Sequence, residues 1–99
     1  MLNIRKTQED ALLRIALEGR LDTTTAPQLE AELKDSTNGV ESLVINCEKL
    51  DYISSAGLRV LLSAHKAMSA KGGMKVTKIN EIVQEVFDVT GFCDVLDIE

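Results

Sequence analysis

The chain has 99 residues, which suffices for one domain with a modest hydrophobic core. Its formal net charge is −5 and we find no basic face in the sequence, which argues against nucleic-acid binding. Cys47 and Cys93 lie far apart without CxxC spacing, so no disulfide framework or metal site is predicted. No segment approaches the roughly 20 apolar residues of a membrane span, and no signal peptide is evident. We therefore expect a cytoplasmic protein without membrane contact.

Three strands are predicted in the first half of the chain. Apolar residues alternate with polar ones over residues 2–7 and 11–18, and these two strands should pair as an antiparallel hairpin. Gly19 ends the second strand or forms a bulge. Residues 42–47 contain consecutive apolar residues, as expected for a strand that is covered on both faces.

A first helix is predicted over residues 25–35. Thr25 and Gln28 have the spacing of a capping box, and Pro27 falls in the first turn, where its missing N–H is harmless. Leu29, four residues before Leu33, should face the core.

The second half predicts a helix over about residues 56–71, a short strand over 74–78 and a last helix over about 80–90. A strand, helix, strand order implies a parallel pair with a right-handed crossover. The last residues, from Phe92, form a final short strand or a docking tail. The fold class is therefore α/β: a single domain with a mixed four- or five-stranded sheet and three helices packed against it.

Two serines lie between the central strand and the second predicted helix. A serine just before a helix is first of all an N-cap, and we expect Ser55 in that position. The surrounding sequence, Tyr-Ile-Ser-Ser-Ala-Gly-Leu-Arg-Val-Leu-Leu over residues 52–62, resembles the signature of the anti-sigma factor antagonist family, the STAS domains. The flanking elements also follow the family's order, so the resemblance covers nearly the whole chain and implies one STAS domain over residues 1–99.

The resemblance implies a function as well as a fold. It predicts an anti-sigma factor antagonist of a partner-switching pathway, which binds an anti-sigma factor with serine kinase activity when unphosphorylated and is released on serine phosphorylation. A phosphoserine phosphatase is left open as a second partner. The alternative is a stand-alone STAS scaffold module that binds another regulatory partner. A small-ligand or nucleotide binder is a weaker third possibility, because the sequence shows no phosphate cradle.

Two neighbouring serines are candidates for the phosphorylated residue. Well-known family members carry the phosphorylated residue immediately before the glycine, and here that position is Ala56, which has no hydroxyl. By resemblance to members with a Ser-Ser-Ala-Gly-Leu sequence, the first choice is Ser55 and the second is Ser54. A domain that uses neither serine stays possible.

The same resemblance implies a set of partner-binding residues around the start of the second helix and the loop before the first: Arg20, Asp22, Thr23, Ser54, Ser55, Gly57 and Arg59. Asp22 has a purely local alternative, because Asp is favoured at caps and turns. Arg59 points away from the core and either meets the partner or remains solvated. Gly57 is explained by close approach of a strand or partner, or is merely tolerated.

No catalytic machinery is predicted. The only histidine, His65, lies about two and a half turns into the helix from Ser55, roughly 15 Å along the axis, so it cannot activate that hydroxyl. We find no paired carboxylates, Gly-rich phosphate loop or metal cluster, and we therefore expect a protein that is not an enzyme, with no cofactor.

Overall fold

Strands and helices alternate along most of the chain. The structure is a computed structural model that describes residues 2–36, 39–91 and 96–98. Its elements are β1 (Leu2–Glu9), β2 (Leu12–Leu21), α1 (Ala26–Ser36), β3 (Ser42–Ile53), α2 (Ser55–Ser69), β4 (Met74–Thr77), α3 (Glu81–Thr90) and β5 (Asp97–Ile98).

The strands form one mixed sheet in the order β1-β2-β3-β4-β5. β1 and β2 make the predicted antiparallel hairpin, with Leu2 opposite Gly19. β2, β3, β4 and β5 are mutually parallel, because helices α1, α2 and α3 each carry the chain back to the start of the next strand. The predicted α/β class and mixed sheet are therefore confirmed.

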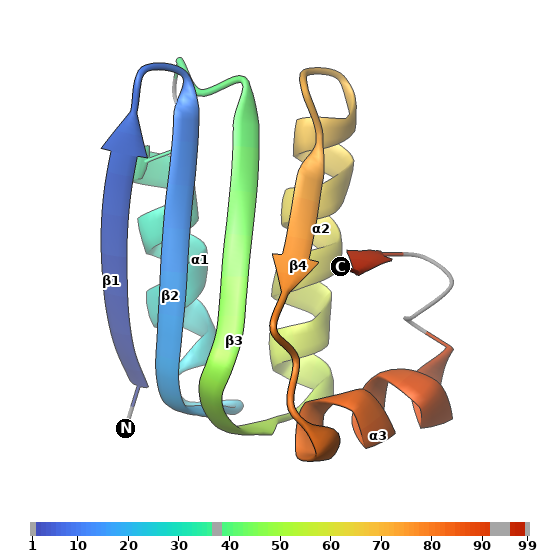
Figure 1. Ribbon diagram of the computed structural model, residues 1–99. Coiled ribbons are helices and arrows are strands. Elements are labelled where there is room, and N and C mark those ends of the chain that lie inside the picture. Colours follow the sequence, from blue (N-terminus) through green and yellow to red (C-terminus); the bar gives the residue numbers. More distant parts are fainter. Residues whose placement is uncertain (1, 37–38, 92–95, 99) are drawn as a thin grey trace.

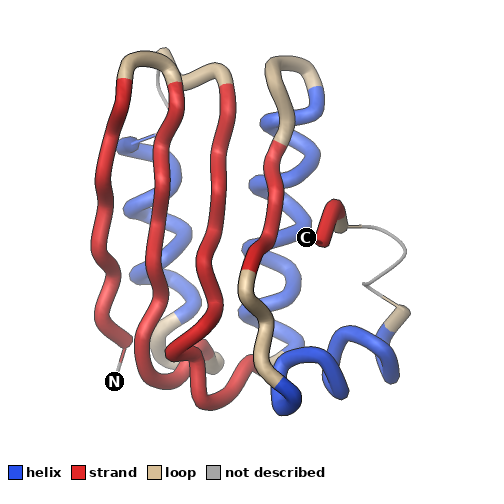
Figure 2. Tube along the Cα trace, viewed as in Figure 1, coloured by secondary structure: helices blue, strands red, loops and turns tan. Residues whose placement is uncertain are grey.

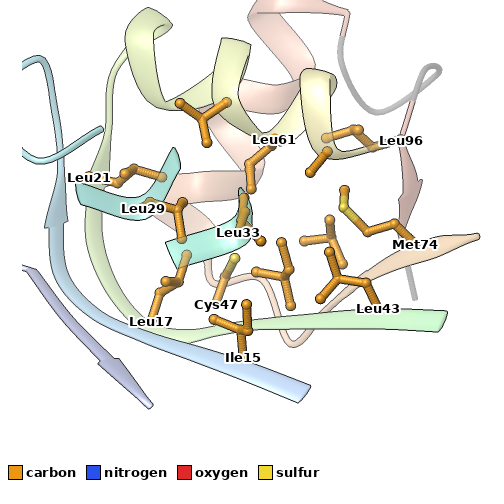
Figure 3. Close-up of a cluster of buried hydrophobic side chains, with 14 of the residues drawn as sticks. Ile15, Leu17, Leu21, Leu29, Leu33, Leu43, Cys47, Leu61, Met74 and Leu96 are labelled. Atoms are coloured by element: carbon orange, nitrogen blue, oxygen red, sulfur yellow. The ribbon is translucent and has the colours of Figure 1, made fainter. Parts of the chain in front are cut away.

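Helices α1 and α2 lie against the same face of the sheet, and α3 lies below the end of β4 and runs outward from there (Figures 1 and 2). The core fills the space between this face and the helices. Leu13, Ile15 and Leu17 alternate inward from β2 and are buried. Figure 3 shows Ile15 and Leu17 beneath Leu29 and Leu61 of the helices. Each of these side chains is almost fully buried. None of the helices of the described residues lies on the opposite face of the sheet (Figure 1).

Strand β3 is twice the predicted length. It continues past residue 47 to Ile53, because its second half pairs with the end of β2 and places Leu21 opposite Ile53. The pairing shifts register twice, once beside Gly19, which has φ 104° and makes the predicted bulge. These shifts interrupt the alternation of apolar residues, so the sequence pattern predicts only the regular first half.

The C-terminal elements are fixed by their caps. Asn80 Oδ1 accepts from the backbone N–H of Val83 at 3.0 Å, and its Nδ2 donates to the Leu50 carbonyl at 2.6 Å, which ties α3 to β3. Gly91 ends α3 in the left-handed conformation. Phe92 lies outside the described residues, while Leu96 is buried and β5 pairs with β4. No helix among the described residues is long and apolar enough to cross a membrane.

Candidate functional site

Helix α2 begins at Ser55, one residue earlier than the predicted start at about residue 56. Ser54 has extended backbone angles, φ −99° and ψ 173°, and its Oγ accepts from the backbone N–H of Gly57 at 3.4 Å. Ser54 is therefore the N-cap, and the expectation that Ser55 takes this position is wrong. Both serines precede the same apolar pattern, so only the backbone geometry separates the cap from the first helical residue.

Ser55 is the first residue of α2 and its side chain is exposed. Its hydroxyl makes no hydrogen bond with any described residue, whereas the Ser54 oxygen is occupied by the cap. The first-turn N–H groups and the positive end of the helix dipole lie beside Ser55. Of the two serines, Ser55 is thus the accessible one, in a place that tolerates negative charge.

The loop between β2 and α1 is organised by the carboxylate of Asp22. Its Oδ1 accepts from the Thr24 hydroxyl at 2.7 Å and from the backbone N–H groups of Thr24 and Thr25 at 3.0 and 3.1 Å. These bonds, that from the Thr24 hydroxyl above all, lower the pKa of Asp22 to about 2, against an opposing effect of partial desolvation. The local interpretation of Asp22 as a turn residue is therefore correct.

Thr25 supports the same loop in a way that the sequence did not predict. Its hydroxyl donates to the Arg20 carbonyl at 2.8 Å and accepts from the Asp22 N–H at 2.8 Å. The Gln28 side chain donates to the Leu2 carbonyl at 3.2 Å instead of reaching back to Thr25. The predicted capping box is thus wrong, because neighbouring loop residues bond the Thr25 hydroxyl and a β1 carbonyl bonds the Gln28 side chain.

This loop lies directly beside the start of α2. The Ser54 N–H donates to the Leu21 carbonyl at 2.9 Å, which continues the pairing of β2 with β3 into the helix cap. The Arg20 guanidinium lies over the Tyr52 ring, 4.4 Å from its centroid, and Arg20 Nε is 3.7 Å from Asp22 Oδ2. Tyr52, which the sequence analysis did not select, is 37 % exposed and belongs to this surface.

Gly57 is buried beneath the loop and contributes packing. A Cβ at this position would lie 2.6 Å from Leu21 Cγ and 3.1 Å from Ile53 Cγ1. Both neighbours are fully buried strand residues, so they have little freedom to withdraw. The close approach suggested by the sequence is therefore that of β2 and β3, and Gly57 offers no side chain to a partner.

A shallow hollow adjoins the exposed serine between the first turns of α1 and α2. Its volume is about 430 Å³, and Thr23, Pro27, Ala56 and Arg59 are among its lining residues. Arg59 is exposed and forms no ion pair with any described residue. The structure thus brings six of the seven expected partner-binding residues to one surface, with Asp22 and Ser54 half-buried: Arg20, Asp22, Thr23, Ser54, Ser55 and Arg59.

His65 lies on α2, ten residues beyond Ser55, and is half-buried. At 1.5 Å per residue it is roughly 15 Å further along the helix, out of reach of the Ser55 hydroxyl. No group of three potential metal ligands occurs among the described residues. His65 therefore cannot act as a general base towards the Ser55 hydroxyl.

The sequence matches the STAS domain family over residues 3–99. The chain belongs to the STAS domain family. Among its relatives, the BtrV protein of Bordetella bronchiseptica, named as a candidate anti-sigma factor antagonist, is 37 % identical over 91 residues, which is 90 % of this chain and 78 % of BtrV. The anti-sigma-B factor antagonist of Staphylococcus aureus is 26 % identical over 99 residues, covering 98 % of this chain and 92 % of the relative.

Solved structures share the fold at lower identity. An anti-sigma factor antagonist from Mycobacterium paratuberculosis superposes with a TM-score of 0.89 at 19 % identity, over 99 % of this chain and 85 % of that one. The phosphorylated form of the Bacillus cell fate determinant SpoIIAA gives 0.75 at 19 % identity, over 98 % of this chain and 91 % of that one. These similarities show that this chain shares the fold of both solved structures.

Proposed function

We propose that this STAS domain is an anti-sigma factor antagonist whose binding to an anti-sigma factor is switched by phosphorylation of Ser55. The observation that carries the proposal is the exposed, unbonded Ser55 hydroxyl at the first position of α2, beside the Asp22 loop. Relatives named as anti-sigma factor antagonists support the role. The partner we propose is an anti-sigma factor with serine kinase activity.

Phosphorylation at this position changes the surface more than the fold. A phosphoserine carries nearly two negative charges, and at the first helical residue these meet free N–H groups and the favourable end of the dipole. The carboxylate of Asp22, ionised because its pKa is about 2, adds negative charge to the same surface. A partner that fits the neutral serine closely would have to accommodate a dianion beside this carboxylate, and its affinity falls.

Intact-mass analysis of the protein recovered from its native cells tests the modification. We expect one phosphate on the parent and on Ser54→Ala, mapped to the peptide that contains Ser55, and none on Ser55→Ala. Phosphate retained by Ser55→Ala and lost by Ser54→Ala would assign the switch to Ser54. An unmodified parent in cells that contain the active kinase would favour the scaffold alternative.

Binding to the kinase partner tests the switch itself. Ser55→Asp should fold normally yet bind much more weakly than Ser55→Ala, since only the former mimics the added charge. The pair controls for loss of the hydroxyl. Equal affinities of the two variants and the parent would show that negative charge at Ser55 does not control binding.

A further inference from the structure

Arg59 lies one helical turn after Ser55 on α2, and both side chains are exposed. Residues four positions apart share one face of a helix, with their Cβ atoms about 5–6 Å apart. Long side chains of a helix lean back towards its N-terminus over the preceding turn. The guanidinium group of Arg59 therefore leans towards Ser55.

The helix itself offers Arg59 no acidic partner. Helix α2 contains no aspartate or glutamate over Ser55–Ser69, so the positions three and four residues before and after Arg59 are all uncharged. Arg59 also forms no ion pair with the rest of the chain that the structure describes. Its guanidinium group is thus available to a new anion on this face of α2.

The charged groups of the neighbouring elements are paired with one another. In the loop between β2 and α1, Arg20 Nε is 3.7 Å from Asp22 Oδ2. Glu30 of α1 borders the same hollow as Arg59, but its Oε1 lies 3.6 Å from the Lys34 Nζ. Of these three cations, Arg59 is the one without an acidic partner among the described residues.

We propose that Arg59 is the internal counter-cation of phosphorylated Ser55, and that its guanidinium group pairs with the phosphate across one turn of α2. This inference rests on the phosphorylation of Ser55 proposed above. The anion precedes the cation by four residues and lies at the positive end of the helix dipole, which is the favourable orientation of such a pair. A planar guanidinium group can donate two parallel hydrogen bonds to phosphate oxygens.

The pairing gives phosphorylation a second effect on the partner-binding surface. In the unmodified protein, the Arg59 guanidinium group is free to meet acidic groups of a partner. After phosphorylation, the same group is held by the phosphate of its own helix. The modification therefore adds a dianion at Ser55 and also withdraws a cation from the surrounding surface.

Genetically encoded phosphoserine at position 55 tests the pairing without a kinase. The second ionisation of a phosphoserine lies near pH 6, and an adjacent cation lowers its midpoint because it favours the dianion. By ³¹P nuclear magnetic resonance, we expect the midpoint of the parent phosphoprotein to lie a few tenths of a pH unit below that of its Arg59→Gln variant, on the scale of an exposed ion pair. Asp22 is present in both proteins, and the difference should shrink at high salt.

Two matched variants separate the position of the charge from its sign. Lys66→Gln removes one charge from an exposed residue of α2, eleven positions beyond Ser55 and about 16 Å along the axis, and should leave the midpoint at the parent value. Arg59→Lys keeps the charge and should retain most of the lowering. Equal midpoints of the parent and Arg59→Gln, or equal rises for Arg59→Gln and Lys66→Gln, would overturn the proposal.

The Nε–H resonance of Arg59 reports the contact directly. It should shift between the unmodified and the phosphorylated parent, and an unchanged resonance would contradict the pairing. Phosphate found on Ser55 in native cells together with equal midpoints would refute the role of Arg59 alone. Unmodified Ser55 in cells with active kinase would refute the proposed switch, and with it the regulatory role of the pair, whatever the midpoints. Circular dichroism of all variants reports whether α2 is intact.

Discussion

At the scale of single residues, the two serines divide their work. Ser54 caps α2 through its bond to the Gly57 N–H, whereas Ser55 contributes no hydrogen bond with the described residues. We expect Ser54→Ala to lower the free energy of unfolding by about 1 kcal/mol, the usual cost of losing a cap, and Ser55→Ala to change it by less than about 0.5 kcal/mol. Urea denaturation measures both values. A larger loss for Ser55→Ala would return the cap to Ser55.

The free energy of unfolding should depend on pH through Asp22, and Asp22→Asn removes this contribution. Its pKa falls from 3.8 to about 2 in the folded protein, because the carboxylate accepts from the Thr24 hydroxyl and the loop N–H groups. A carboxyl whose folded pKa is depressed adds stability above its unfolded pKa and loses it as the pH falls through the folded value. The parent should therefore lose more stability than Asp22→Asn between about pH 4 and pH 2. Parallel profiles in acid titrations of the unfolding free energy would contradict this.

The cap of α2 and the position of Tyr52 could not be predicted correctly from the sequence. The Ser-Ser-Ala-Gly-Leu motif indicated the helix start and the surface around Ser55 and Asp22. It led to the wrong choice of Ser55 over Ser54 as the N-cap, because both residues are serine and only the backbone angles distinguish them. Tyr52 was missed because its stacking partner, Arg20, is adjacent only through the pairing of β2 with β3.

At the scale of elements, local periodicity predicted most helices and strands but misjudged β3. Regular alternation ends near Cys47, and the remaining strand exists because bulged pairing with β2 satisfies its backbone. Arg5 and Arg14 likewise become diagonal neighbours only through the register of β1 with β2, because they belong to different strands.

The contact between α2 and the sheet depends on Gly57. A methyl group there would lie 2.6 Å from Leu21 Cγ, in a region where neither group can move into solvent. Although alanine favours a helix by about 1 kcal/mol over glycine, we expect Gly57→Ala to destabilise the fold by about 1–3 kcal/mol through overpacking.

A double-mutant cycle with Leu21→Ala tests this explanation. Removing the Leu21 side chain makes room for the new methyl group, so the combined loss of unfolding free energy should be smaller than the sum of the single losses. Strict additivity would show that Leu21 and the added group do not meet. A stabilised Gly57→Ala would show that glycine is merely tolerated in the helix.

At the scale of the whole molecule, the net charge of −5 and the position of individual charges act differently on association. Arg59 borders the hollow beside Ser55, whereas Lys66 lies seven residues along the same helix, about 10 Å further on. Arg59→Glu and Lys66→Glu change the net charge equally. If Arg59 lies at the rim of the interface with an acidic kinase surface, its reversal should slow association more and weaken the dependence of the rate on salt, because rim charges steer encounter.

Stopped-flow association with the kinase partner at low and high salt decides the matter. Screening shortens the range of exposed charges to about 8 Å at physiological ionic strength, so the two variants should differ most at low salt and converge at high salt. Both substitutions should leave the unfolding free energy within about 0.5 kcal/mol of the parent, which excludes a folding defect as the cause. Equal rates and salt slopes for Arg59→Glu and Lys66→Glu would show that only the net charge affects association. The interface would then be centred on Asp22 and Thr23 and not on Arg59.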